Sequence, residues 1–308
     1  MYPAAILVWV VIGLRRQKIL SICAALCIGL WLPAARAEVT FGALCFNTDA
    51  AYINLQDEEV SDWAAFFAFL DSFPKLEKVD MFATGVHRKE IAQLAQRYPN
   101  VEFGWTMQFA EHTIRTDATA FSTLHYSGAK THTNEDFSIL KYCKNLRALD
   151  IGHNSVNDLS FLYDLPELRV LIIACNRVTD IAPLASLTHL EYLEMFSNYV
   201  EDLSPLVHLP YLAHLNIGYN NIRDLSPLYQ MPQLKRLWIK KCHGRPKVAP
   251  LSEEVVASLQ AALGDCEIDA THNPSEGGWR DETHFEVFHE YFRTGEYRPF
   301  PDSPEENR

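Results

Sequence analysis

Apolar and polar positions follow one repeated pattern between Asn145 and Pro232, in four consecutive blocks of 22 residues. Each block reads L-x-x-L-x-[LIM]-x-x-N-x-[VI]-x-D-[LI]-x-x-L. The blocks begin at Leu146, Leu168, Leu190 and Leu212. A fifth register continues the leucine positions and carries Cys242 where the asparagine stood. A fixed period of this size predicts a solenoid, because each unit can bury its apolar face only against its neighbours.

Within each block the alternating segment, such as Leu193-Glu-Met195, predicts a short strand with alternate side chains pointing into the core. Stacked blocks place these strands side by side in a parallel sheet. A column of asparagines follows the strands, where the chain turns inward: Asn154, Asn176, Asn198 and Asn220. A buried turn exposes amide and carbonyl groups to a dry interior, and an Asn side chain can satisfy both. We therefore interpret this column as structural and not as a ligand site.

The second half of each block predicts one 3₁₀ turn on the convex side, because Ser before Pro is typical of an N-cap followed by the first helical position. A row of carboxylates precedes these turns: Asp158, Asp180, Asp202 and Asp224. Such a row suggests a metal or catalytic site. At a 22-residue spacing, however, the four side chains line one convex edge, where capping and solvation of the turns is the better interpretation.

The N-x-I-x-D-[IL]-[SA]-P-L string resembles the bacterial internalin-type leucine-rich repeats, over Asn145 to about Cys242. The flanks look like the less regular coils of secreted repeat proteins of gut Gram-positive bacteria. The resemblance implies a curved extracellular scaffold that binds a protein through its concave sheet. No position in the family has an enzymatic role that could be assigned to a residue of this chain. We expect an α/β fold: a leucine-rich repeat solenoid with a parallel concave sheet, helices or 3₁₀ turns on the convex side, and helical caps.

Five segments follow from these patterns. They are a signal peptide (1–37), irregular N-terminal coils with a cap (38–144), regular repeats (145–242), a C-terminal cap (243–300) and a disordered tail (301–308). In the N-terminal coils we expect strands at 52–55, 76–81, 101–105 and 121–126, and helices at 62–73 and 88–98, as the first part of the same solenoid. In the C-terminal cap we expect a helix at 253–263, a strand at 266–268, and an aromatic helix at 284–292 that covers the open end of the solenoid.

Residues 1–37 have the layout of a secretory signal peptide. They contain four basic and no acidic residues, an apolar run from Ile19 to Leu32, and a small-x-small sequence, Ala35-Arg-Ala37, before Glu38. The apolar run is too short for a comfortable membrane span. A preceding apolar stretch, 4–14, makes the basic region unusually long, so an uncleaved anchor or a misplaced start codon stays open as an alternative.

Removing that segment leaves 23 of the 27 basic residues against 39 acidic ones, a net charge of −16. An acidic chain is a poor partner for nucleic acid or anionic membranes. The mature chain contains no further long apolar run, so we predict that it does not insert into a membrane. We expect a monomer, secreted or held in the cell envelope, that requires no cofactor.

Five cysteines remain in the mature chain: Cys45, Cys143, Cys175, Cys242 and Cys266. An odd count with irregular spacing is not a disulfide framework. One bridge, Cys242–Cys266 near the C-terminal cap, stays open. The chain has no C-x-x-C pair, and His284 and His289 do not form an H-E-x-x-H motif, so we predict no metal site.

The outward strand positions form columns across the concave sheet, and we expect them to contact the partner. The candidates are Asp150, Ile172, Tyr192, Glu194, Phe196, His214, Tyr219, Arg236, Trp238 and Lys240. A contiguous exposed aromatic patch usually marks a binding site, and we expect Tyr192, Phe196, Tyr219 and Trp238 to supply most of the affinity. The charge changes from acidic near Asp150 and Glu194 to basic near Arg236 and Lys240, which could orient a partner. The alternative is that the C-terminal tail covers this face.

The sequence thus predicts a binding module for a protein or, less favoured, a glycan. A structural envelope or spacer protein without a selective ligand is the second hypothesis. A catalytic pair of His153 and Cys175, adjacent in one column, is the third. An open sheet offers neither a closed pocket nor an evident oxyanion hole, so we predict no catalytic residue and no enzyme.

Overall fold

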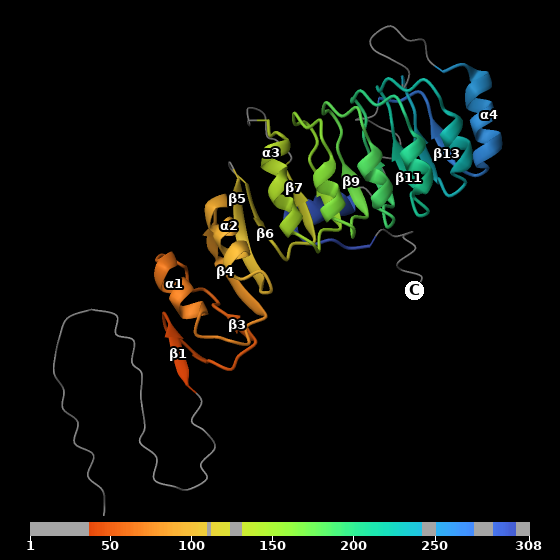
Figure 1. Ribbon diagram of the computed structural model, residues 1–308. Helices are drawn as coiled ribbons and strands as arrows, with labels where there is room; N and C mark the ends of the chain where they lie inside the picture. Colours follow the sequence, from red (N-terminus) through yellow and green to blue (C-terminus); the bar gives the residue numbers. More distant parts are fainter. Residues whose placement is uncertain (1–36, 110–111, 124–130, 242–250, 274–285, 300–308) are drawn as a thin grey trace, which may run out of the picture.

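The computed structural model describes residues 37–109, 112–123, 131–241, 251–273 and 286–299 (Figure 1). The predicted signal peptide and the 301–308 tail lie outside these ranges, apart from Ala37. The described residues form three sheets, of two, four and seven strands. The elements follow one another along an extended body, with α1 near one end and α4 at the other (Figure 1). Within the described ranges, none of the helices has the length and apolar character that a membrane crossing requires.

The seven-stranded sheet contains the regular repeats. Its strands are β7 (Ala120–Ser122), β8 (Ala148–Asp150), β9 (Val170–Ile172), β10 (Tyr192–Glu194), β11 (His214–Asn216), β12 (Arg236–Trp238) and β13 (Glu267–Asp269). All pairings are parallel and in sequence order. Tyr192 pairs with Val170 on one side and His214 on the other, so one 22-residue period separates neighbouring positions. The predicted parallel solenoid is confirmed.

The strands β7 to β11 are each followed on the opposite side by a short helical turn. The helix α3 (Asn134–Phe137) runs into η1 (Ser138–Tyr142), and the regular 3₁₀ turns are η2 (Ser160–Asp164), η3 (Ala182–Ser186), η4 (Ser204–His208) and η5 (Ser226–Gln230). The aspartate before each regular turn caps it: Asp202 Oδ1 accepts from the Ser204 amide at 2.8 Å, and Oδ2 from its hydroxyl at 2.8 Å. The expectation of a serine N-cap was wrong, because Ser204 is the first residue inside the turn and its side chain makes no cap bond there.

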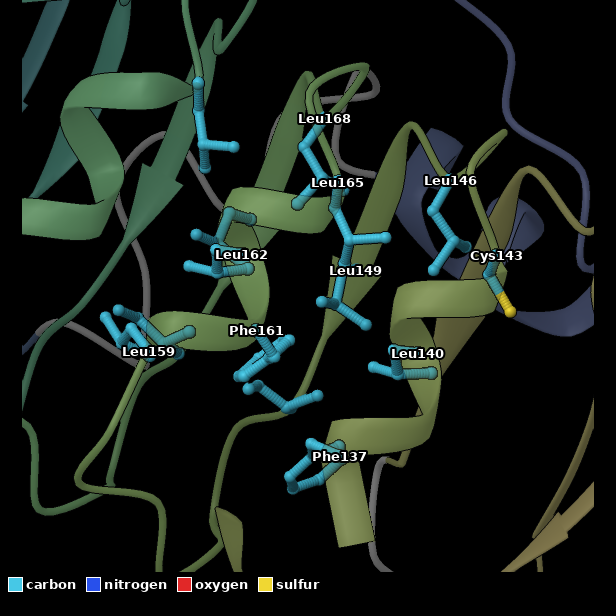
Figure 2. Packing of buried hydrophobic residues seen from close by; sticks show 14 of the residues in the cluster. Phe137, Leu140, Cys143, Leu146, Leu149, Leu159, Phe161, Leu162, Leu165 and Leu168 are labelled. Carbon is cyan, nitrogen blue, oxygen red and sulfur yellow. The ribbon is translucent and has the colours of Figure 1, made fainter. Parts of the chain in front are cut away.

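The core lies between the sheet and these turns and consists of stacked leucine rows. Figure 2 shows side chains of two successive coils packed together, with Leu140 from one coil and Leu146, Leu149, Leu162 and Leu165 from the next. These five side chains are fully buried. Burying a leucine contributes about 1.5–3 kcal/mol. Because each coil supplies only half of its neighbour's environment, the coils are stable as a stack and not singly.

The asparagine column connects each coil to the one before it. Asn198 is completely buried, and its Nδ2 donates to the carbonyl oxygens of Ile173 (2.9 Å) and Met195 (3.1 Å). Its Oδ1 accepts from the amide of Val178 at 3.0 Å. Asn176 and Asn220 make the corresponding bonds one coil away on either side. Buried backbone groups of three successive turns are satisfied in this way.

The N-terminal part does not continue the sheet of the repeats, and this corrects the expectation of one uninterrupted solenoid. Its four-stranded sheet has β3 (Tyr52–Asn54), β4 (Lys78–Val86), β5 (Glu102–Phe109) and β6 (His112–Arg115), with α1 (Trp63–Leu70) and α2 (Arg88–Arg97) between strands. The strands β4 and β5 run beyond the predicted lengths, and β6 folds back antiparallel on β5. A returning strand occupies the edge on which β7 would have paired, so a second sheet begins at β7.

A short hairpin that the sequence analysis missed precedes this part. It consists of β1 (Glu38–Phe41) and β2 (Leu44–Asn47), and Gly42 at its turn has a φ of +58°. Phe41 packs on Phe66 of α1, with ring centroids 5.5 Å apart. Buried residues of both larger sheets belong to one continuous core, despite the interrupted sheet. At the other end, α4 (Glu253–Leu263) has the predicted bounds, and β13 follows it as the last strand of the large sheet.

Candidate functional site

The face of the seven-stranded sheet that points away from the core, called the concave face here, is covered by the C-terminal part of the chain. The helix α5 (Glu286–Thr294) lies against β7 and β8. It is the dark-blue helix behind β7 and β9 in Figure 1, on the side away from the 3₁₀ turns. The predicted aromatic helix exists, but the expectation that it covers the open end of the solenoid was wrong. It covers the sheet.

Aromatic side chains make this contact. Phe288 stands against Tyr192, with ring centroids 4.5 Å apart, and Tyr291 packs edge-on to Phe288 at 5.8 Å. Phe288 is 5% exposed, and Tyr291 and Tyr192 are fully buried. Together with Ala120, Ala148, Val170 and Trp238 they form a second apolar cluster, separate from the main core. The concave face therefore has an apolar core of its own.

The segments on either side of α5 are held by hydrogen bonds. After α5, the carbonyl of Gly295 accepts from the amides of Thr119 (3.3 Å) and Ala120 (3.0 Å). After β13, the carbonyl of His272 accepts from the indole Nε1 of Trp238 at 3.0 Å. Asn273 Oδ1 accepts from the Tyr219 hydroxyl and the Lys240 ammonium, both at 3.1 Å. The tail is thus attached near both ends of the sheet.

Asp269, the last residue of β13, shapes the turn that directs the chain onto this face. Its Oδ1 accepts from the amides of Thr271 (2.8 Å) and His272 (2.9 Å), and its Oδ2 lies 2.7 Å from His272 Nδ1. Burial alone would raise the pKa of Asp269, but these hydrogen bonds and the nearby imidazole lower it below its ordinary value. The carboxylate is therefore held ionised in this turn.

The ten predicted binding residues lie on the concave face, but the expectation that they are solvent-exposed was wrong. Six are buried: Asp150, Tyr192, Glu194, Phe196, His214 and Trp238. Four are partly buried: Ile172, Tyr219, Arg236 and Lys240. For Tyr192 the reason is α5, whose Phe288 ring lies against it, and Trp238 belongs to the same apolar cluster and donates to the His272 carbonyl. The strand alternation fixed their direction correctly, and their role in binding stays a prediction.

The polar members of this set are bonded within the face. The Tyr192 hydroxyl donates to the Glu194 carboxylate. Asp150 accepts from the Gly152 amide at 2.9 Å and from the Ser122 hydroxyl at 3.1 Å. Such bonds offset the cost of burying polar groups. The Ser122–Asp150 bond also joins β7 to β8, the two strands against which α5 lies.

The column that holds His153 and Cys175 has an unusual backbone. Residues of this column have positive φ values in five successive registers: His153, Cys175, Ser197, Tyr219 and Lys241, between 50° and 58°. His153 is exposed and Cys175 is partly buried. This conformation turns the chain from the strand into the asparagine turn. The hypothesis of a catalytic pair gains no support from it.

The other cysteines of the described residues have environments that suppress thiolate formation. Burial raises the pKa of the Cys143 thiol far above its ordinary value and that of Cys266 to about 11. Cys266 is a free thiol, and Cys242, its predicted partner, lies outside the described residues. His284 and the side chain of His289 also lie outside them. Among the side chains that are described, no group of three or more His, Cys, Asp or Glu is arranged to hold a metal ion.

Phe288 and Tyr291 are the concave-face residues that the sequence analysis did not assign to this site. A signal for them was present. The outward column at the third block position reads Ala120, Ala148 and Val170 before it reaches Tyr192. Three small side chains in adjacent strands leave room for a helix, whose diameter with side chains is about 10–12 Å.

Comparison with known proteins bears on the repeats. A family model described as "Leucine Rich repeats (2 copies)" matches residues 166–208, and one described as "Leucine Rich repeat" matches residues 142–159. Together with the observed coils, these matches confirm the predicted leucine-rich repeats. No curated protein sequence matches the chain.

Solved structures similar to this chain include two internalins of Listeria monocytogenes. Internalin C2 is 22% identical with a TM-score of 0.39, and the match covers 66% of this chain and 74% of that one. The internalin InlF is 20% identical with a TM-score of 0.42, covering 66% and 70%. A leucine-rich repeat protein of Leptospira interrogans is 16% identical with a TM-score of 0.33, covering 55% and 39%. The resemblance to internalin-type repeats thus concerns the fold.

Proposed function

We propose that this chain is an exported binding module that recognises a protein partner through the concave face of its repeats. Three features support the proposal: leucine-rich repeats, a signal-peptide layout in residues 1–37, and a concave face rich in aromatic side chains. The observation that carries it is the contact of Phe288 with Tyr192, ring centroids 4.5 Å apart, which supports the idea that this face takes up an aromatic side chain from outside the repeats. Buried aromatic anchors of this kind supply most of the affinity in protein interfaces.

In the described state α5 occupies this face, so partner binding requires that α5 leave it. The strands beneath do not need to rearrange, since their main core contains no residue of α5, and release of α5 opens only the second cluster. On recognition, the contacts of α5 with the concave face are replaced by contacts of the partner with the same face. Only molecules in which α5 has left the face can bind the partner. The apparent affinity for the partner is therefore the intrinsic affinity multiplied by the fraction of molecules with an open face.

The test compares capture of partners by four forms of the 38–308 protein from culture and host-cell surface extracts, with cross-linking. The first is the unchanged protein, and the second carries Phe288→Ser and Tyr291→Ser, which remove the anchors of α5. The third adds Ala148→Arg to the second, which places a charged side chain on the freed face. The fourth carries Arg293→Ser on the exposed side of α5 and serves as control.

We expect the second form to capture a partner more efficiently than the unchanged and control proteins, and the third form to lose it. Capture of the same proteins by all four forms would contradict concave-face recognition. Amino-terminal sequencing of the protein in culture medium tests export, and a mature sequence beginning at Glu38 is expected. A protein retaining residues 1–37 in the membrane fraction would support the uncleaved anchor instead.

A structural envelope or spacer protein is the second candidate. The observation that favours it is the covered concave face, since a spacer has no use for an open binding surface. This hypothesis predicts that none of the four forms captures a selective partner.

A further inference from the structure

We propose that the partner of this module is an amphipathic helix with aromatic side chains at positions i and i+3, and that α5 occupies its binding surface in cis. The inference rests on the proposed function and specifies the chemistry of the partner. The binding surface consists of the outward positions of β7 to β10: Ala120, Ala148, Val170 and Tyr192. We call it the helix surface.

The sizes of the side chains on the helix surface select a helix. Ala120, Ala148 and Val170 are at most 2% exposed, although none of their side chains is long enough to cover itself. Tyr192, in the next strand, ends this run of small residues and presents its ring to Phe288 at 4.5 Å. A row of small side chains bounded by one large ring accommodates the cylindrical bulk of a helix, whereas a single extended strand would leave much of that space unfilled.

The exposure of the residues along α5 shows how such a helix is recognised. Phe288 and Tyr291 are buried, and Val287 and Phe292 are partly buried in the same cluster. Glu286 and Arg293 are exposed. Anchors spaced by three and four residues on one side of a helix are the usual mode in which a helix binds an apolar surface. Since the polar side of α5 makes little contribution to the contact, a different helix with the same anchors fits the same surface.

α5 is suited to be replaced because it does not form a stable helix alone. It has nine residues, and isolated helices shorter than about 12–15 residues are marginal in water. Its helical state therefore depends on the helix surface. As a covalently attached segment it has a high effective concentration, so a separate helix competes at a disadvantage until α5 is weakened. The chain thus favours partners whose helix is longer or carries stronger anchors.

The test measures binding of a labelled synthetic peptide with the sequence of residues 286–299 to the full 38–308 protein by fluorescence anisotropy. Three proteins are compared: the unchanged chain, Glu290→Pro, and Phe288→Ser with Tyr291→Ser. Proline at 290 interrupts α5 without altering any side chain of the sheet. A control peptide has serine in place of the phenylalanine and tyrosine. Cooperative thermal unfolding is measured for each protein, and Glu290→Pro provides the test if the double variant does not fold.

We expect the peptide to bind both variants at least about tenfold more tightly than the unchanged protein, because the open fraction of the surface rises. We expect the control peptide to bind none of the proteins, and Ala148→Arg in the Glu290→Pro protein to abolish binding of the peptide. Equal binding of both peptides, equal binding to all proteins, or no binding to a folded variant would overturn the proposal.

This outcome is separable from that of the capture experiment. Peptide binding without capture of any natural partner refutes the proposed function and leaves the helix surface intact as an intramolecular docking site. Capture of a partner without peptide binding supports concave-face recognition and refutes the helical class of partner.

Discussion

Replacing Asn198 by leucine tests whether the asparagine column stabilises the stack of coils. The side chain is 0% exposed, and its shortest bonds are to three backbone groups: the amide of Val178 and the carbonyls of Ile173 and Met195. Leucine is close in size but forms no hydrogen bond. The substitution therefore removes the bonds and keeps most of the packing.

Removing the Asn198 side chain does not cost these three backbone groups the same share of their hydrogen bonds. The Val178 amide loses its side-chain acceptor, and a buried donor left unsatisfied costs about 1–3 kcal/mol. The Ile173 carbonyl keeps a donor at 3.2 Å, Asn176, and the Met195 carbonyl keeps one at 2.9 Å, Asn220. Each carbonyl therefore loses only one of two bonds, at about 0.5–1.5 kcal/mol each. We expect Asn198→Leu to lower the free energy of unfolding by about 1–5 kcal/mol, after allowing for about 1 kcal/mol from the added apolar burial.

Urea unfolding followed by circular dichroism measures this difference. The matched control is Asn221→Leu, at a partly exposed position in the neighbouring coil, where a change within about 0.5 kcal/mol is expected. A loss of less than about 1 kcal/mol for Asn198→Leu, with unchanged cooperativity, would refute the assignment of the column as a hydrogen-bonded support of the turns.

Three further outcomes are expected. Tyr192→Ser with Trp238→Ser should lower stability by about 6–10 kcal/mol in thermal unfolding, about 3–5 for each fully buried side chain; an unchanged midpoint would indicate that the C-terminal segment does not cover them. The Cys266 thiol, buried and with a pKa of about 11, should react with iodoacetamide at pH 8 more slowly than Cys45, whose pKa is also raised but whose sulfur is exposed; mass spectrometry of the native protein reads the rates, and equal rates would contradict the packing of the C-terminal cap. Ser197→Gly should stabilise the protein by about 0.5–1 kcal/mol, because Ser197 has a φ of +56° that glycine adopts without strain; destabilisation in urea would contradict this.

Much of the fold could be predicted because it depends on interactions that recur every 22 residues. The leucine rows, the direction of Tyr192 and Trp238, and the position of Asn198 follow from the strand alternation and the period. Each of these features is satisfied by the neighbouring coil. A pattern that is local in sequence therefore contains the required information.

The tertiary structure decided the features that depend on distant segments. The break between the two sheets arises because β6 turns back on β5, and the apolar pattern of β6 does not specify whether it pairs parallel or antiparallel. The covering of the concave face joins residues as far apart as Thr119 and Tyr297, which are separated by 178 positions. Alternation along a strand determines which side chains face outward, but it does not determine what lies against them. For this reason the sequence located the concave face, and only the folded chain showed that Phe288 and Tyr291 occupy it.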